Sequence, residues 1–76
     1  MKRRRFHVTK RPEGGWQVKE EGMDEPCIRV DTKATAIACG KEVAKAAKPS
    51  QLIVHKENGQ FEEEYTYGGD PYPPAG

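Results

Sequence analysis

Hydrophobic and polar residues alternate over two short stretches near the start of the chain, residues 5–9 and 16–20. A period of two is typical of a β-strand with one buried face. The segment between them, PEGG at residues 12–15, favours a turn because its glycines tolerate positive φ. The two stretches are therefore predicted to form a hairpin, and residues 27–30 a third strand. The side chains expected to face the core are Phe6, Val8, Trp16, Val18, Ile28 and Val30.

The hydrophobic period changes after Thr32, where the alanine-rich segment KATAIACGKEVAKAAK begins. Apolar residues recur here at the three- and four-residue spacing of a helix. Thr32 is a suitable N-cap, because its hydroxyl accepts a backbone N–H that the first helical turn leaves free. Pro49 is expected to end the helix, and Gly40 predicts a close approach to the sheet. The apolar face consists of Ala36, Ile37, Gly40, Val43, Ala44 and Ala47.

Two further strands are expected after the helix, over residues 52–55 and 61–67. Asn58-Gly59 lies between them and predicts a type I′ hairpin turn. The element order is β-β-β-α-β-β, which predicts an α+β fold in which an antiparallel sheet carries one helix packed on one face. The strand order stays open. The core residues expected from this part are Leu52, Val54, Phe61 and Tyr65.

The 76 residues are long enough for one small domain, which we expect over residues 1–67. Residues 68–76 contain three prolines and are expected to form an extended tail rich in proline and glycine.

Positive charge is concentrated at the start of the chain. Residues 1–19 contain seven lysines and arginines and one acid, Glu13, although the net charge of the whole chain is only +1. Strand alternation places several of these side chains on the sheet face away from the helix. Arginine and lysine on such a face contact phosphates, and glutamine reads base edges. The candidate nucleic-acid-binding residues are Arg3, Arg5, His7, Gln17, Lys19 and Arg29.

The same residues have a second interpretation, as an ordinary solvated face. Glu62 and Glu64 alternate with the apolar residues of the last strand and are predicted to project from the same face. If the last strand lies beside the first, these carboxylates neutralise Arg3 and Arg5 through cross-strand pairs. The order of the strands therefore separates the two interpretations.

Two other features favour structural roles. Lys41, Lys45 and Lys48 lie along one helix flank and either contact phosphate or, as we expect, form a solvated stripe. Trp16 has the chemistry to stack on a base, but its alternation with Val18 predicts a position in the core.

Catalysis and metal binding are not expected. His7 and His55 are the only imidazoles, and one helix on one sheet leaves little room for a substrate cavity. Cys27 and Cys39 lack metal-ligand spacing, and whether they form a disulfide stays open. The sequence thus predicts no enzyme, no cofactor and no small-molecule substrate. No apolar stretch approaches the ~20 residues that cross a bilayer, and the N-terminus lacks a secretory signal, so a cytoplasmic location without membrane binding is expected.

The end of the chain offers a candidate site for a protein partner. It is predicted either to bind a partner's aromatic groove as a polyproline segment or to fold back over the core. A free sheet edge also allows pairing with a second copy, which predicts a homodimer as another alternative. The candidate partner-binding residues are Tyr67, Asp70, Pro71, Tyr72, Pro73 and Pro74.

Motifs along nearly the whole chain resemble a bacterial family. They are HV and GGW-x-VK in the hairpin, DTK-x-x-AI at the start of the helix, and L-x-VH-x-x-NG followed by EEE-x-TYG and DP-x-PP-x-G. Together they resemble the small bacterial proteins grouped as domain of unknown function 2188. Membership implies a shared fold and no particular activity.

Residues 13–46 are also similar to the arm-site DNA-binding domains of tyrosine recombinases. The likeness consists of a G-x-W-x-V strand, a second strand and T-K-x-x-A at the start of a helix. In those domains a three-stranded sheet enters the major groove. Two hypotheses result: a non-catalytic module that binds duplex DNA or another nucleic acid through the outer sheet face, or a protein-interaction or self-association module that uses a sheet edge or the tail.

Overall fold

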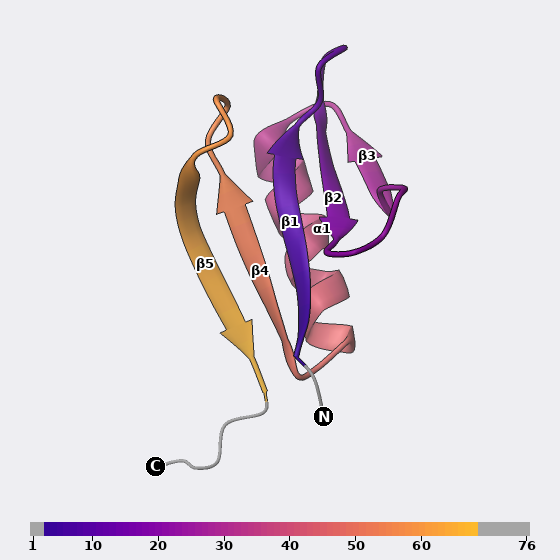
Figure 1. Ribbon diagram of the computed structural model, residues 1–76, viewed down its shortest axis with the longest axis vertical. Coiled ribbons are helices and arrows are strands. Elements are labelled where there is room, and N and C mark those ends of the chain that lie inside the picture. Colours follow the sequence, from indigo (N-terminus) through magenta and orange to yellow (C-terminus); the bar gives the residue numbers. More distant parts are fainter. Residues whose placement is uncertain (1–2, 69–76) are drawn as a thin grey trace.

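The computed structural model describes residues 3–68, which form five strands and one helix (Figure 1). Both the α+β class and the predicted order β-β-β-α-β-β are confirmed. The elements are β1 (Arg4–Lys10), β2 (Trp16–Glu20), β3 (Ile28–Val30), α1 (Lys33–Ala46), β4 (Ser50–His55) and β5 (Phe61–Tyr67).

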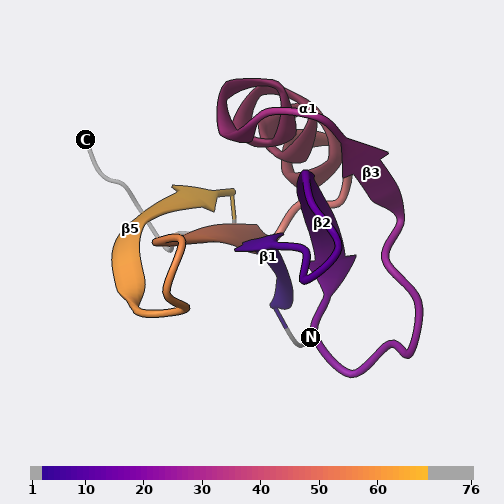
Figure 2. The same ribbon diagram turned by 90° about the horizontal axis from the view of Figure 1, so that it is seen from above.

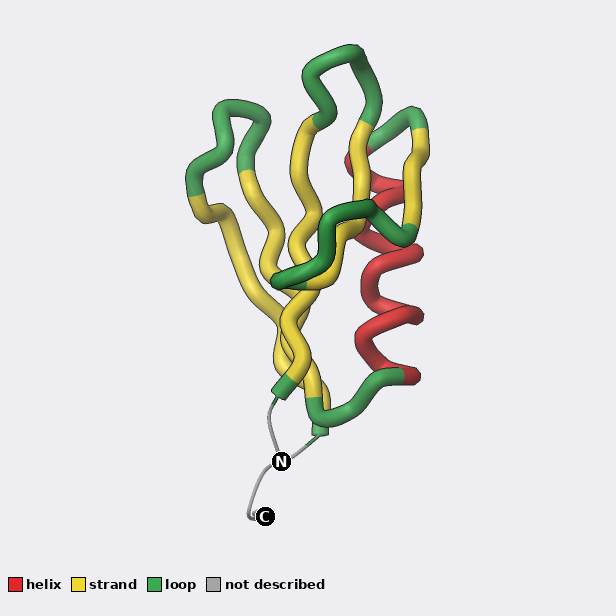
Figure 3. Tube along the Cα trace, turned by 45° about the vertical axis from the view of Figure 1, so that its right-hand side comes forward, coloured by secondary structure: helices red, strands yellow, loops and turns green. Residues whose placement is uncertain are grey.

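The five strands form one sheet in the order β3-β2-β1-β4-β5. All neighbours are antiparallel except β1 and β4, which run parallel. The expectation of a purely antiparallel sheet was therefore wrong at one pair. The reason is α1, which carries the chain from the end of β3 back to the start of β4, so that β4 runs in the same direction as β3 and β1. As a result, the β1–β2 and β4–β5 connections lie at the same end of the sheet (Figure 3).

Helix α1 covers one face of the sheet, and the opposite face carries no helix within the described residues (Figure 2). The helix-covered face holds the core, which is close to the predicted set. Ile28, Val30, Ile37, Val43 and Tyr65, all expected in the core, are half-buried and pack around its centre. The buried hydrophobic residues are Phe6, Val8, Trp16, Val18, Ala36, Ala44, Leu52 and Val54.

The ends of α1 follow the sequence signals. The Thr32 hydroxyl accepts a hydrogen bond from the backbone N–H of Thr35, as expected of an N-cap. The helix ends at Ala46, three residues before Pro49. The buried Ser50 donates a side-chain hydrogen bond to the carbonyl of Ala44, which connects the last helical turn to β4.

The β4–β5 hairpin differs from the prediction. Its turn closes with hydrogen bonds from the Gly59 N–H to the Lys56 carbonyl and from the Lys56 N–H to the Gln60 carbonyl. Gly59 has a φ of 95°, whereas Asn58 does not have the positive φ that a type I′ turn requires. The connection is therefore a three-residue loop, and the type I′ assignment was wrong.

A β-bulge in the same hairpin changes the faces of β5. The register shifts between Val54 and His55, which are opposite Glu63 and Phe61. The extra residue, Glu62, breaks the alternation that the sequence pattern assumed. Phe61 consequently lies opposite His55 on the sheet face away from α1 and is 57% exposed, so its predicted core position was wrong.

The remaining fold predictions concern the thiols, membrane crossing and the tail. Cys27 and Cys39 are free thiols. Among residues 3–68, no helix is long and apolar enough to cross a membrane. Tyr67 is half-buried and packs against the core. The other candidate tail residues, Asp70, Pro71, Tyr72, Pro73 and Pro74, lie outside the described residues.

Candidate nucleic-acid interface

The predicted site residues of β1, β2 and β3 share the face of the sheet that α1 leaves uncovered, which we call the outer face. Strand register places His7 opposite Lys19 on β2, and Gln17 opposite Arg29 on β3. Arg5, two residues before His7, points to the same face. Arg3 is exposed and directly precedes β1. The outer-face positions derived from alternation in β1, β2 and β3 are therefore confirmed.

The carboxylates near these side chains are not those that the sequence suggested. Because β4 separates β1 from β5, the glutamates of β5 do not lie beside Arg3 and Arg5. Glu62 instead pairs with Lys33 at the start of α1, so its predicted outer-face position was wrong. Glu64 lies opposite Ile53 on the outer face, as predicted.

Glu21 is the carboxylate that contacts the centre of the outer face. It lies 2.9 Å from the Nε2 atom of His7 and 3.7 Å from the Arg5 guanidinium. The hydrogen bond with His7, aided by the charge of Arg5, lowers the pKa of Glu21 from its usual value of 4.5. Glu21 is therefore a carboxylate at neutral pH, and it offsets part of the positive charge there.

Arg4 and Glu20 form a second ion pair on the helix side of the sheet. Both Arg4 nitrogens Nε and Nη2 donate to the Glu20 carboxylate at 2.8 Å. This bidentate hydrogen bond and the charge of Arg4 lower the pKa of Glu20. Arg4 also lies over the Phe6 ring, 5.4 Å from its centre. Its role is thus to cover the edge of the core.

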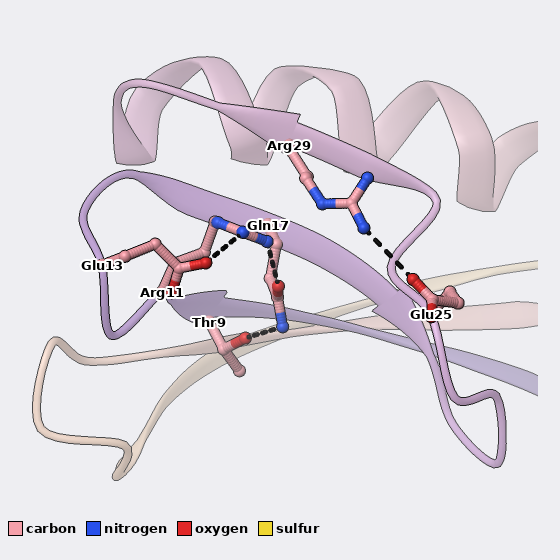
Figure 4. Close-up of polar contacts among 6 residues, drawn as sticks. All are labelled: Thr9, Arg11, Glu13, Gln17, Glu25 and Arg29. Atoms are coloured by element: carbon pink, nitrogen blue, oxygen red, sulfur yellow. Dashed lines mark hydrogen bonds and ion pairs between the residues drawn. The ribbon is translucent and has the colours of Figure 1, made fainter.

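The β2 and β3 side of the outer face is held by side-chain hydrogen bonds (Figure 4). The Gln17 carbonyl accepts from Arg11 at 2.9 Å, and its amide donates to the Thr9 hydroxyl at 3.2 Å. Arg11 also pairs with Glu13. Both polar ends of Gln17 are therefore occupied, which leaves it less suited to base reading than the sequence suggested.

Arg29 and Lys19 are the more available cations of this face. Arg29 contacts Glu25 at 3.2 Å, and both side chains are mostly exposed, at 54% and 82%. Within residues 3–68, Lys19 has no ion-pair partner. It lines a shallow depression of about 320 Å³ together with His7, Thr9 and Met23. Glu21, Gly22 and Met23 of the β2–β3 loop line this depression, and the loop extends away from α1 (Figure 2).

A second depression, of about 520 Å³, lies at the N-terminal end of β1 and is open to solvent. All five of its lining residues are charged, three arginines and two glutamates. The residues are Arg3, Arg4, Arg5, Glu20 and Glu21.

The two histidines meet on the outer face, which the sequence analysis did not predict. His7 Nδ1 lies 2.9 Å from His55 Nε2. Their ring centres are 5.2 Å apart. This equals the distance between the two nitrogens plus the distance from each nitrogen to the centre of its own ring, as expected when both nitrogens lie on the line between the ring centres. The two nitrogens therefore face each other in line, as in an N–H···N hydrogen bond. Only the parallel pairing of β1 with β4 brings these residues together, and no sequence motif signalled it.

Other polar features have structural roles. Lys41 lies 4.4 Å from the centre of the Tyr65 ring and so joins α1 to β5, whereas Lys45 and Lys48 are exposed. Trp16 is 9% exposed and belongs to the core, as predicted. No group of three or more metal-ligating side chains occurs within residues 3–68.

Comparison with known proteins agrees with the first of the two resemblances in the sequence, that to domain of unknown function 2188. A family model described as "Uncharacterized protein conserved in bacteria (DUF2188)" matches residues 6–67. No curated protein and no solved structure matches the chain. The match includes His7, Gln17, Lys19 and Arg29 and begins just after Arg5. Because it extends over most of the chain, the protein belongs to the DUF2188 family of bacterial proteins of unknown function.

Proposed function

We propose that the protein is a non-enzymatic module of the bacterial cytoplasm that binds nucleic acid through the basic half of its outer face. The basic half consists of the outward side chains of β1, β2 and β3. Strand order carries the proposal, because β4 lies between β1 and β5 and keeps the glutamates of β5 away from Arg5, Lys19 and Arg29. This removes the contact with the β5 glutamates that would have favoured a merely solvated face, and Glu21 and Glu25 are the carboxylates that pair with Arg5 and Arg29 instead.

The ion pairs on this face are compatible with phosphate binding. Arg5 and Glu21 are each 53% exposed and 3.7 Å apart, and the Arg29–Glu25 pair is even more accessible. Exposed pairs of this kind contribute little stability. A phosphate oxygen can therefore replace the carboxylate at small cost, and the arginine forms a charge-assisted hydrogen bond with the phosphate instead.

Three phosphate contacts follow from this arrangement, one each for Arg5, Lys19 and Arg29. The side-chain carbonyl of Gln17 accepts a hydrogen bond from Arg11. Gln17 therefore positions Arg11 beside these three cations. With three contacts, counterion release gives an affinity that falls by about 40-fold between 50 and 200 mM salt.

The test is a titration of the full chain with short duplex DNA and with single-stranded DNA, followed by amide chemical shifts at both salt concentrations. We expect shifts on β1, β2 and β3. Lys19→Gln weakens binding at every sequence and reduces the slope of log affinity against log salt by about one. Lys45→Gln makes the same charge change on the exposed flank of α1 and leaves binding and slope unchanged.

Three results would contradict the proposal: no shifts with either DNA, binding that does not depend on salt, or equal losses for Lys19→Gln and Lys45→Gln. Shifts restricted to β5 on addition of a protein or peptide would instead favour the alternative function, a protein-interaction module. The seven-residue edge strand β5 and the exposed Phe61 beside it are the observations that favour this alternative.

A further inference from the structure

His7 and His55 belong to a hydrogen-bonded chain that crosses the outer face. It begins at the Glu21 carboxylate, 2.9 Å from His7 Nε2. It continues through the 2.9 Å contact between His7 Nδ1 and His55 Nε2 and ends at the Gly59 carbonyl, 3.2 Å from His55 Nδ1. The chain joins the β2–β3 loop, β1, β4 and the β4–β5 turn. All four ring nitrogens are engaged in it.

The number of protons in this chain follows from the chemistry of its ends. A carboxylate and a backbone carbonyl only accept hydrogen bonds. His7 Nε2 and His55 Nδ1 must therefore both carry a proton, and the contact between the rings needs one more. Three protons are required, but two neutral imidazoles carry only two. With only two protons, one of the three contacts has no hydrogen between its two atoms. Two acceptor atoms then face each other, either two ring nitrogens or a ring nitrogen and an oxygen, and their lone pairs repel.

We propose that His7 and His55 share a third proton and form an imidazole–imidazolium pair, so that one positive charge at the centre of the outer face regulates the affinity for phosphate. Loss of the proton removes this charge and opens one of the three contacts. The regulatory part of the inference deepens the proposed function and rests on it, whereas the shared proton does not depend on nucleic acid.

The charged groups around the pair carry both signs. The carboxylate in direct contact, Glu21, favours the charged form of the pair, and the partial burial of both rings shields the contact between them from water. The charged residues that face the pair or flank it are Arg5 on β1, Lys19 on β2, Glu21 in the β2–β3 loop, Glu64 on β5, and Lys56 and Glu57 after β4.

The proton count is tested on the ¹⁵N-labelled full chain without nucleic acid. Long-range ¹H–¹⁵N spectra between pH 8 and pH 6 distinguish protonated from unprotonated ring nitrogens. At the acidic end we expect three protonated nitrogens and a scalar coupling across the contact between His7 Nδ1 and His55 Nε2. Two neutral rings at pH 6, or the absence of the coupling, would overturn the inference.

A matched pair of variants tests the role of the carboxylate. Glu21→Gln keeps the acceptor oxygen but removes the charge, and we expect it to reduce the fraction of three-proton pairs at pH 7 by several-fold. Glu20→Gln makes the same change one residue earlier, on the other face of the sheet, and should leave that fraction unchanged. An equal effect of both variants would contradict the assignment. Both positions are near the surface, so neither variant is expected to unfold the protein.

The regulatory part is tested by duplex DNA affinity at pH 8 and pH 6 in constant salt. We expect the affinity of the wild type to rise by about fivefold on acidification, as one added phosphate contact would give. The double variant His7→Gln/His55→Gln removes both imidazoles and should abolish this rise. A rise that persists in the double variant would overturn the regulation. Complete absence of DNA binding, with the three-proton pair still observed, would refute the proposed function and its regulation while the shared proton stands.

Discussion

Gly40 allows α1 to approach the sheet closely. A Cβ atom at this position would lie 2.9 Å from Leu52 Cδ1 and 3.4 Å from Val18 Cγ2. Both of these neighbours are fully buried, so neither can move freely. The low helix propensity of glycine, which costs about 1 kcal/mol relative to alanine, is thus offset by the contact it permits.

Gly40→Ala is therefore expected to destabilise the protein, although it improves helix propensity. Overpacking of a dense core costs roughly 1–3 kcal/mol, which exceeds the propensity gain of about 1 kcal/mol. We expect a net loss of about 1 kcal/mol in the free energy of unfolding, measured with urea. Ala38→Gly, on the exposed side of α1, measures the cost in helix propensity of a glycine where no packing changes. A Gly40→Ala variant more stable than the wild type would show that the helix has room to move outward.

Glu20 gives stability that depends on pH. Its pKa in the folded protein is lowered by the hydrogen bond with Arg4, so the unfolded chain binds the proton more tightly. The Arg4–Glu20 pair therefore stabilises the fold above about pH 4.5, and this contribution disappears as pH falls through the lower pKa of the folded state. The contribution is small, because more than half of the Arg4 side chain is exposed.

Urea unfolding at pH 6 and pH 3.5 checks this expectation. Glu20→Gln should be less stable than the wild type at pH 6, and the difference should shrink at pH 3.5. Glu57→Gln, in a turn where no ion pair is found among residues 3–68, controls for the change in net charge. A difference between wild type and Glu20→Gln that is the same at both pH values would refute the role of the ion pair.

At the scale of elements, the β-bulge in the β4–β5 hairpin determines which side chains of β5 face the core. Val54 and His55 are consecutive residues of β4, but their partners on β5, Glu63 and Phe61, are not consecutive. Glu62 is the extra residue between these two partners. Glu62 then reaches Lys33 on the helix side, while Tyr65 packs against the core and donates a hydrogen bond to Glu63 at 3.0 Å. Without the bulge, Phe61 and Glu62 would exchange faces.

Phe61→Ala is expected to cost less than about 1 kcal/mol, because the side chain already exposes more than half of its surface. Val54→Ala, next to the bulge but fully buried, removes fewer atoms yet should cost about 2 kcal/mol, since it leaves a cavity. Urea unfolding of both variants measures the contrast. A larger loss for Phe61→Ala than for Val54→Ala would place Phe61 in the core and contradict the bulge.

Sequence patterns predicted the elements that depend on local periodicity. Alternation in β1 and β2 placed Phe6 and Val8 in the core and Lys19 on the outer face, because side-chain direction in a regular strand follows from position alone. A bulge adds a single residue without a distinct sequence signal, so the same rule failed at Phe61 and Glu62. The His7–His55 contact was equally hidden, because it depends on which strands become neighbours.

For the whole molecule, strand order separates charge into two regions. The outward side chains of β1, β2 and β3 are mainly basic, and β5 contains three consecutive glutamates at the opposite edge. A net charge of only +1 therefore conceals an uneven surface. Sequence alone could not establish this separation, since the two regions would have neutralised each other had β5 paired with β1.

The acidic edge also affects self-association. An antiparallel, two-fold symmetric pairing of β5 with a second copy over its full length is centred on its middle residue, so Glu64 of the two copies would lie directly opposite each other. Like charges at such positions destabilise a strand pair. We therefore expect a monomer in sedimentation velocity at physiological salt, and increased dimerisation in Glu64→Thr, because threonine favours strands and carries no charge. Glu57→Thr, outside β5, should leave the mass unchanged. A stable wild-type dimer that Glu64→Thr does not strengthen would show that this charge does not protect the edge.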